Sequence, residues 1–166
     1  MLQIKKLKLT HKKDLRVILS DFNLVLNVGD RAVIIGEEGN GKSTLLKWIY
    51  NPSFVEDYIE AEGEKIIGKE CFGYLPQEMS EEDKKKTIYE YFSQEELFWN
   101  KSPKELSEIA GKFGLTNEFF YSEQEMGSLS GGEKIKAQLM RIFIQDATVL
   151  LLDEPLAALD LKMRKD

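Results

Sequence analysis

A glycine-rich stretch, residues 32–44 (AVIIGEEGNGKST), combines residue types that can bind phosphate. The apolar run at residues 32–35 predicts a buried strand, and residues 44–50 predict a helix. Glycines in such a loop let backbone N–H groups approach phosphate oxygens without a Cβ clash, and the helix N-terminus adds a positive dipole end. The pattern G-x-x-x-x-G-K-[ST] is completed by Gly36, Gly41, Lys42 and Ser43. The stretch therefore predicts a nucleoside triphosphate site.

The residue roles follow from the same pattern. We expect Lys42 to reach the β- and γ-phosphates and the Ser43 hydroxyl to ligate Mg²⁺. The alternative is a glycine-rich turn that happens to precede Lys-Ser, and the strand before and the helix after it argue against that alternative. The expected nucleotide contacts are Gly36, Glu37, Glu38, Gly39, Asn40, Gly41, Lys42, Ser43 and Thr44.

A second stretch, residues 149–155 (VLLLDEP), is an apolar run that ends in two carboxylates. A continuous apolar strand is typical of a parallel sheet buried on both faces, where ligands gather at the carboxyl ends of the strands. We expect Asp153 to hold Mg²⁺ and Glu154 to polarise the water that attacks the γ-phosphate. A core strand followed by two surface acids is the plainer alternative, and the upstream phosphate loop makes it the weaker one.

A third stretch, residues 129–133 (LSGGE), opens a predicted amphipathic helix that runs to about Gln145. By itself, serine before two glycines is an ordinary helix N-cap. The same composition can also present a serine hydroxyl and a positive helix N-terminus to a phosphate. Residues 129–133 are interpreted as functional only because the chain also contains the stretches at residues 32–44 and 149–155.

Composition limits the function classes. The 166 residues can form one domain or part of a larger one, and 42% hydrophobic with 31% charged residues is typical of a globular chain. A formal net charge of −6 argues against binding to nucleic acid or anionic membrane through overall charge. The single cysteine, Cys71, is expected in the core, and the sequence has no run of transmembrane length. A cytoplasmic location without membrane insertion is the default expectation.

The remaining pattern divides into strands and helices. Alternation predicts strands at residues 1–10 and 17–28, and shorter strands are expected at 63–69 and 71–75. Residues 80–128 change character and predict a small inserted helical subdomain, with helices at 87–98 and 104–113. Ser102 and Pro103 form a plausible helix start. The aromatic residues Trp48, Trp99, Phe119, Phe120 and Tyr121 are interpreted as packing residues.

The ordered set of motifs resembles an ATP-binding cassette (ABC) ATPase over nearly the whole chain. The motifs are the phosphate loop, Gln77 in YLPQE, the LSGGE stretch, residues 149–155 and Leu159-Asp160. The resemblance implies an α/β P-loop NTPase (ABC ATPase) core with an N-terminal antiparallel β-subdomain and an inserted helical subdomain. It also implies ATP and Mg²⁺ as cofactors.

Further roles are implied by the resemblance alone. Gln77 is similar to the family's Q-loop glutamine, which joins the core to the helical subdomain and serves the Mg²⁺ and γ-phosphate side of the site. Asp160 is similar to the aspartate that couples two sites across a dimer. Ser130, Gly131 and Gly132 resemble the signature motif, which closes on the ATP of a second cassette. The expected catalytic set is Glu154, Lys42 and Gln77, and the expected metal set is Ser43, Gln77 and Asp153.

The subfamily stays open between two alternatives. Glu133 after the double glycine resembles soluble ABC-F proteins, which pair two cassettes and act on ribosomes. Residues 156–160 (LAALD) are closer to transporter cassettes, whose partner is a membrane subunit. We favour the ABC-F interpretation, with a second cassette from the same parent chain or from a homodimer.

There are two departures from the family pattern: residues 1–166 contain neither the switch histidine nor the strand that bears it, which in the family lies between the phosphate-loop strand and the strand of residues 149–155. The family's switch histidine follows the stretch around Asp160, whereas the only histidine here is His11. His11 is interpreted as a polar turn residue rather than as a stacking partner for adenine. We therefore expect residues 1–166 to be a single, incomplete ABC ATPase domain. A third functional alternative is an ATP-gated binding module with little turnover.

Overall fold

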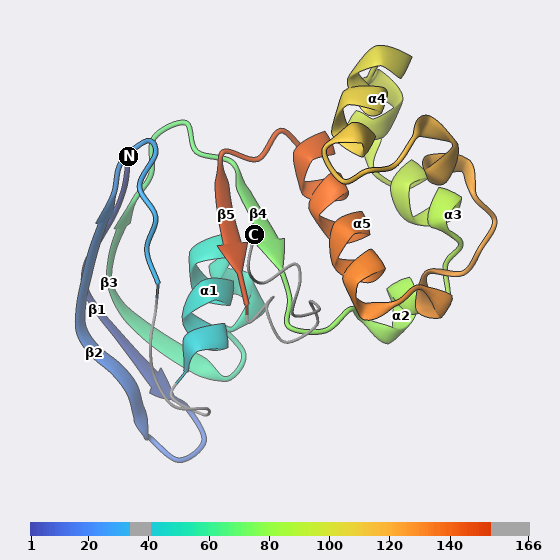
Figure 1. The fold of residues 1–166 in the computed structure, drawn as a ribbon. Helices are drawn as coiled ribbons and strands as arrows, with labels where there is room; N and C mark the ends of the chain where they lie inside the picture. Colours follow the sequence, from blue (N-terminus) through green and yellow to red (C-terminus); the bar gives the residue numbers. More distant parts are fainter. Residues whose placement is uncertain (34–40, 154–166) are drawn as a thin grey trace. The chain divides into compact units, whose positions relative to one another are not determined.

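The computed structural model describes residues 1–33 and 41–153 (Figure 1). It separates into two compact units, residues 1–74 and residues 75–166, and each unit is described by itself. The first unit carries the N-terminal sheet and the helix that follows the glycine-rich loop. The second unit carries most of the helices.

The first unit contains a three-stranded antiparallel sheet, shown in blue and blue-green in Figure 1. Its strands are β1 (Leu2–His11), β2 (Val17–Leu26) and β3 (Ile59–Ile66), in the order β2-β1-β3. The alternation predicted for the first two strands is confirmed, and β3 begins four residues before the predicted strand. The apolar side chains of β1 are fully buried: Leu2, Ile4, Leu7 and Leu9.

The register between β1 and β3 depends on a glycine. The pairing shifts between Lys5 and Lys8, and Gly63 of β3 lies at this irregularity with φ +127°. A Cβ atom on Gly63 would lie 2.8 Å from the Leu7 Cα. That approach is shorter than any ordinary carbon–carbon contact, so the two strands can come this close only because position 63 has no side chain.

Helix α1 (Lys42–Tyr50) follows the glycine-rich loop and begins two residues before the predicted helix. Its apolar side is buried at Leu45, Trp48 and Ile49. Asn51 ends it, and η1 (Pro52–Phe54) follows with the Asn51 side chain as its cap, so the predicted helix stop at Asn51-Pro52 is confirmed. The helix positions the end of the glycine-rich loop against the sheet of the first unit.

The C-terminal end of α1 is held by a lysine from β3. The Lys65 Nζ donates to the Ile49 carbonyl oxygen at 3.1 Å and lies 5.2 Å from the centre of the Trp48 ring. A cation at the carbonyl end of a helix complements the helix dipole. Partial burial lowers the pKa of Lys65.

The second unit begins at the last residue of β4 (Phe72–Leu75) and ends its described part after β5 (Val149–Leu152), and these two strands form a two-stranded sheet. Between them the chain is helical. The elements are α2 (Glu81–Lys84), α3 (Ile88–Ser93), η2 (Glu96–Asn100), α4 (Pro103–Gly111), η3 (Asn117–Tyr121), η4 (Met126–Ser128) and α5 (Gly131–Ile144).

The helix predicted at residues 87–98 is shorter in the structure. Thr87 caps α3 through a capping box with Glu90, but α3 ends at Ser93. The indole Nε1 of Trp99 donates to the Ser93 carbonyl oxygen at 2.8 Å. This bond satisfies a carbonyl at the end of the helix, where the next turn would otherwise provide the donor, and the chain then forms the separate turn η2.

One hydrophobic core joins the helices of the second unit. Helix α5 contributes Ala137, Met140 and Ile144 to it, so this core extends beyond the predicted inserted subdomain of residues 80–128. The boundaries of that subdomain stay a prediction. Other members of the core are Met79, Ile88, Tyr91, Phe92, Phe98, Leu106, Ala110, Phe120, Met126 and Leu129.

Some of the predicted packing residues are not buried. Trp48 and Phe120 are buried, which agrees with the prediction, and Phe119 is half-buried against the core. In contrast, Trp99 is 61% exposed and Tyr121 is 54% exposed, so these two pack against other rings at the surface and not in the core. Both rings lie on short turns, η2 and η3, rather than on the buried face of a helix.

Two burial expectations are wrong. Cys71 is exposed, because it precedes β4 instead of lying within the strand. In β5, only Leu151 is buried, while Leu150 is 44% and Leu152 is 41% exposed. The strand therefore alternates between a buried and an exposed face, whereas the apolar run predicted burial on both. In the described part of the chain, no helix combines the length and apolarity that crossing a membrane requires.

Candidate functional site

The N-terminus of α1 is built on a glycine. Gly41 is the N-cap, with φ +81° and ψ 16°, which is the left-handed region. A Cβ atom there would lie 1.9 Å from the Ile18 Cγ2 of β2. Both the backbone angle and the close approach of the Ile18 side chain disfavour a side chain at this position. The glycine predicted from the phosphate-loop pattern thus has a structural reason within the described residues.

The start of helix α1 differs in composition from the starts of the other α-helices. Its cap makes no side-chain hydrogen bond, and its first turn contains no acidic residue. In contrast, α2 to α5 each begin with a serine or threonine cap and an acidic residue in the first turn. Lys42, Ser43 and Thr44 are half-buried in the first turn of α1. The start of α1 therefore fits an external anion better than the start of any other α-helix that the structure describes.

Several predicted site residues lie outside the described residues. They include the catalytic candidate Glu154, the coupling candidate Asp160, and five residues of the glycine-rich loop: Gly36, Glu37, Glu38, Gly39 and Asn40. The roles expected for these residues stay predictions.

In the second unit, the structure brings two predicted metal ligands onto paired backbone segments. The Asp153 N–H donates to the Leu75 carbonyl oxygen at 3.0 Å, and Gln77 follows two residues after Leu75. Asp153 is only 4% exposed, whereas Gln77 is exposed. A buried carboxylate requires a compensating partner.

Magnesium bound with a nucleotide needs few protein ligands. It usually takes one or two protein oxygens together with phosphate oxygens and water. Across residues 1–33 and 41–153, no three His, Cys, Asp or Glu side chains form a group that could hold a metal without such help. The chemistry of Ser43, Gln77 and Asp153 as oxygen donors fits a magnesium ion that arrives with its nucleotide.

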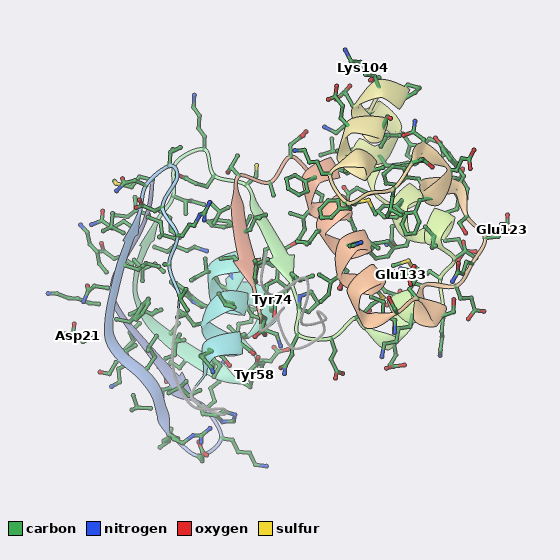
Figure 2. All side chains as sticks on the ribbon, in the orientation of Figure 1. Asp21, Tyr58, Tyr74, Lys104, Glu123 and Glu133 are labelled. Carbon is green, nitrogen blue, oxygen red and sulfur yellow. The ribbon has the colours of Figure 1, made fainter. Side chains whose placement is uncertain are left out.

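The LSGGE stretch forms the start of α5, as predicted. Ser130 is the N-cap, and its Oγ accepts the Glu133 N–H at 3.1 Å, while the Glu133 Oε1 accepts the Ser130 N–H at 3.2 Å. Ser130 and Gly131 are exposed and Gly132 is half-buried. Figure 2 shows Glu133 at this end of the helix. Accepting the Glu133 bond leaves the hydrogen of the Ser130 hydroxyl able to donate to another group.

The sequence interpretation missed the second half of this capping box. Serine followed three residues later by glutamate is the pattern that could have revealed it. The carboxylate of Glu133 fixes the orientation of Ser130, the residue expected to contact phosphate.

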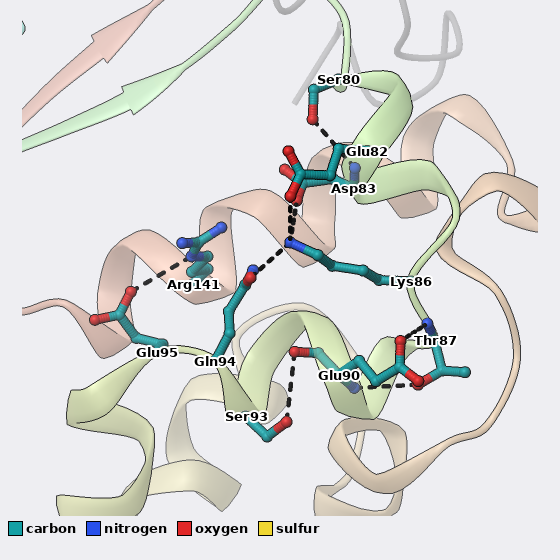
Figure 3. Close-up of polar contacts among 10 residues, drawn as sticks. All are labelled: Ser80, Glu82, Asp83, Lys86, Thr87, Glu90, Ser93, Gln94, Glu95 and Arg141. Atoms are coloured by element: carbon teal, nitrogen blue, oxygen red, sulfur yellow. Dashed lines mark hydrogen bonds and ion pairs between the residues drawn. The ribbon is translucent and has the colours of Figure 1, made fainter.

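The last turn of α5 is held by a polar group around an arginine (Figure 3). The Arg141 Nε donates to the Glu95 Oε2 at 3.4 Å, and the Gln145 Nε2 donates to the same oxygen at 2.8 Å. The Arg141 guanidinium lies 5.0 Å from the centre of the Tyr91 ring. Burial raises the pKa of Tyr91 to about 12, although the neighbouring Arg141 opposes the shift. These contacts fix α5 against α3.

A second group ties together the segment that follows Gln77. The Lys86 Nζ lies 3.1 Å from the Asp83 Oδ1 and donates to the Gln94 Oε1 at 2.6 Å (Figure 3). The Lys86 carbonyl oxygen accepts the Met126 N–H at 2.8 Å. Lys86 therefore anchors the chain between Gln77 and α3 through both its side chain and its backbone carbonyl.

The single histidine ends β1. His11 is half-buried, with its Nδ1 3.6 Å from the Asp14 Oδ1 and its ring centre 6.1 Å from that of Tyr58. These neighbours come from the turn after β1 and from the segment before β3. The interpretation of His11 as a polar turn residue stays a prediction.

Comparison with known proteins links this geometry to one family. A family model described as "ABC transporter" matches residues 19–157. The thiamine import ATP-binding protein ThiQ of Haemophilus influenzae is 35% identical over 167 residues, which covers 89% of this chain and 74% of ThiQ. The mRNA export factor elf1 of Schizosaccharomyces pombe is also 35% identical, over 147 residues, which covers 87% of this chain. The chain spans only 13% of the length of elf1.

Solved structures show the same fold. A putative ABC transporter ATP-binding protein from Pyrococcus furiosus aligns with 99% of this chain and 80% of its own length, at a TM-score of 0.74 and 21% identity. At that identity the likeness concerns the fold alone. It confirms the predicted fold class, an α/β P-loop ATPase with an N-terminal antiparallel sheet.

Proposed function

The chain belongs to the ABC transporter family, since the family model covers residues 19–157, and from this premise we propose that it binds Mg–ATP and hydrolyses it between two paired cassettes. Members of the family bind ATP with Mg²⁺, are generally ATP hydrolases and work as dimers. In this chain, separate residues are assigned to nucleotide binding, Mg²⁺ binding, hydrolysis and dimer closure.

The observation that carries the proposal is the uncapped N-terminus of α1. Gly41 provides no side-chain cap and the first turn contains no acid, so the helix N-terminus suits the oxygens of a phosphate. Lys42, at the first position of the helix, would neutralise the β- and γ-phosphates. Residues Gly36 to Thr44 then act together as the nucleotide-binding segment.

We assign the Mg²⁺ ion to Ser43, Gln77 and Asp153. When bound, the ion would neutralise charge that develops on the phosphates during transfer. The burial of Asp153 supports this assignment, and the bond from its backbone N–H to the Leu75 carbonyl oxygen fixes the backbone that carries the carboxylate. Glu154, the next residue, would orient the attacking water as the general base, assisted by Lys42 and Gln77.

The start of α5 is proposed to close on the ATP of a second cassette. Ser130 and Gly131 are exposed, and the helix directs its N-terminal N–H groups outward. The Ser130 hydroxyl can donate to a phosphate oxygen while its oxygen still accepts the Glu133 N–H. ATP would then lie between α1 of one cassette and α5 of the other.

The test is ATP-dependent dimerisation, measured by sedimentation velocity with and without Mg–ATP. We expect a dimer with Mg–ATP for the unchanged chain, no nucleotide binding by Lys42→Ala, and normal nucleotide binding without dimerisation by Ser130→Arg. Ser102→Arg is the matched control, because Ser102 caps α4 with the same capping box but lies outside the proposed interface. A normal dimer from Ser130→Arg would refute the role given to α5.

Hydrolysis is tested separately. Single-turnover experiments on the unchanged chain and on Glu154→Gln should show loss of hydrolysis with retained ATP binding. If hydrolysis is measurable and Glu154→Gln leaves its rate unchanged, Glu154 is not the base. If the unchanged chain dimerises but shows no hydrolysis at all, the ATP-gated binding module becomes the correct description.

For the subfamily, we propose a soluble ABC-F type factor that acts on the ribosome. Glu133 after the double glycine supports this choice, and the likeness to an mRNA export factor supports a role outside membrane transport. The experiment is co-sedimentation of the Glu154→Gln variant with ribosomes, with and without Mg–ATP. Association only with Mg–ATP is expected, and association that ignores the nucleotide would contradict the proposal.

The second candidate is the motor subunit of a membrane transporter. The likeness to ThiQ, of which this chain covers 74%, favours it, as does the LAALD wording of residues 156–160. In that case the chain reaches the membrane through a partner subunit. Co-purification with a membrane protein, and not with ribosomes, would decide for this candidate.

A further inference from the structure

Three aromatic rings form an exposed cluster on the second unit, and none of them belongs to the residues assigned to nucleotide binding. Trp99 is 61% exposed, Tyr121 is 54% exposed, and Tyr89 is half-buried beside them. The ring centre of Tyr89 lies 6.4 Å from that of Trp99 and 5.8 Å from that of Tyr121. The three residues come from α3, η2 and η3, so the cluster depends on the folded arrangement of this unit.

The rings are held in place before any partner arrives. The Trp99 indole N–H is bound to the Ser93 carbonyl oxygen, and the buried Phe98 contacts both exposed rings, with ring centres 5.5 Å from Trp99 and 6.2 Å from Tyr121. The Tyr89 N–H donates to the Ser122 carbonyl oxygen at 3.0 Å. Aromatic side chains that are already ordered lose little entropy on binding, which suits an interaction surface.

The charged residues of the two segments that carry these rings have one sign. The segments that carry them, residues 87–100 and 117–125, contain six glutamates and no lysine or arginine. The formal charge of these two segments is −6, which equals the net charge of the whole chain, so the charges of all other residues sum to zero. Figure 2 shows Glu123 extending outward from this region. Glu96, Glu118 and Glu123 are all exposed.

Three basic side chains from outside the two segments form ion pairs. The Lys101 Nζ lies 2.6 Å from the Asp146 Oδ1, Lys86 contacts Asp83, and Arg141 contacts Glu95. The carboxylates that these three cations contact do not include Glu96, Glu118 or Glu123. We call the surface formed by Tyr89, Trp99 and Tyr121 with Glu96, Glu118 and Glu123 the aromatic–acidic patch.

We propose that the aromatic–acidic patch binds a lysine- and arginine-rich segment of a partner polypeptide. Guanidinium and ammonium groups stack on tryptophan and tyrosine rings through cation–π attraction, and the surrounding carboxylates pair with the same cations. Negative charge on both segments disfavours an anionic membrane or a nucleic acid as the occupant. The proposal is independent of nucleotide binding, because none of the residues assigned to ATP or Mg²⁺ lies in the patch.

The test uses a fluorescein-labelled peptide of arginine, lysine and glycine, and a neutral peptide of the same length with citrulline and acetyl-lysine in place of the cations. Fluorescence anisotropy is measured at low and at physiological salt. We expect the cationic peptide to bind the unchanged chain and the neutral peptide not to bind. Trp99→Ala/Tyr121→Ala should raise the dissociation constant about tenfold or more, as expected for two lost cation–π partners.

Charge variants keep the test valid if the ring variant fails to fold. Glu96→Gln/Glu118→Gln/Glu123→Gln should weaken binding to a similar extent and reduce its salt dependence, while thermal unfolding shows an intact fold. The matched controls lie in the first unit. Phe54→Ala removes a ring that is 53% exposed, and Glu60→Gln/Glu62→Gln/Glu64→Gln removes three exposed carboxylates of β3.

The outcomes separate clearly. Equal loss in the patch variants and the β3 variants would show diffuse charge attraction and overturn the proposal, as would equal binding of the neutral peptide. Binding of phosphatidylserine-containing vesicles that is lost in Trp99→Ala/Tyr121→Ala would also overturn it, because the occupant would then be a membrane. Selective loss in the patch variants, with both controls unchanged, supports it.

Discussion

Replacing Gly41 with alanine tests whether the N-cap of α1 is shaped by the close approach of β2. An alanine at φ +81° costs about 1–2 kcal/mol, because its Cβ approaches the following carbonyl oxygen. The same Cβ would lie 1.9 Å from the Ile18 Cγ2, and forced rearrangement of this kind costs about 1–3 kcal/mol. We therefore expect Gly41→Ala to lower the free energy of unfolding by about 2–5 kcal/mol and to weaken ATP binding.

A double-mutant cycle separates the two contributions. Ile18→Ala removes the Cγ2 atom and so relieves the steric part, whereas the backbone part remains. The double variant should be more stable than the sum of the single effects by about 1–3 kcal/mol. Urea unfolding of the four proteins gives the coupling free energy, and ATP titration shows whether binding recovers with it.

The control is Gly111→Ala at the end of α4. Nothing lies within 4 Å of a Cβ at Gly111, and its backbone is helical, so alanine there should raise stability by about 0.5–1 kcal/mol. Additive effects of Gly41→Ala and Ile18→Ala, within about 0.5 kcal/mol, would refute the steric argument.

Three further predictions concern stability. Gly63→Ala should lower the free energy of unfolding by about 2–5 kcal/mol in urea titrations, because its Cβ would lie 2.8 Å from the Leu7 Cα; an unchanged midpoint would contradict the observed β1–β3 register. Tyr91 keeps its proton to about pH 12 when folded but releases it near pH 10 when unfolded, so stability should fall by up to about 3 kcal/mol across that window; Tyr91→Phe should lack this loss and the late phenolate titration. The lowered pKa of Lys65 means that the unfolded chain binds more protons than the folded chain in the alkaline range. The free energy of unfolding of the unchanged chain, minus that of Lys65→Met, should therefore rise with pH there. A difference that falls with pH would contradict the burial of Lys65.

The sequence predicts best those features that depend on residues close along the chain. The start of α4 at Ser102-Pro103 and the stop after α1 at Asn51-Pro52 are confirmed, because a cap and a proline act within one turn. The alternation of β1 is confirmed for the same reason, since neighbouring side chains on a strand point to opposite faces.

Features that depend on distant residues were missed. Cys71 was expected in the core because it lies in an apolar stretch, and Trp99 was interpreted as a packing residue, but both side chains are exposed. The exposed leucines of β5 show that an apolar run does not determine how many faces of a strand are covered. The contact between Gly41 and Ile18 joins residues on separate elements, so no local pattern could indicate it. The predicted ligands Ser43, Gln77 and Asp153 depend on such long-range placement, and their roles remain to be measured.

The three capping boxes described above bear on the order in which the chain folds. Helices α3, α4 and α5 each begin with a serine or threonine bonded to a glutamate three residues later, so their starting points are encoded within one turn. The sheet of the first unit instead pairs Gln3 with Ile66, and bringing such distant residues together requires closing a long loop. Because local contacts form faster than distant ones, the helical half of the protein is expected to acquire structure first during refolding, with the N-terminal sheet following.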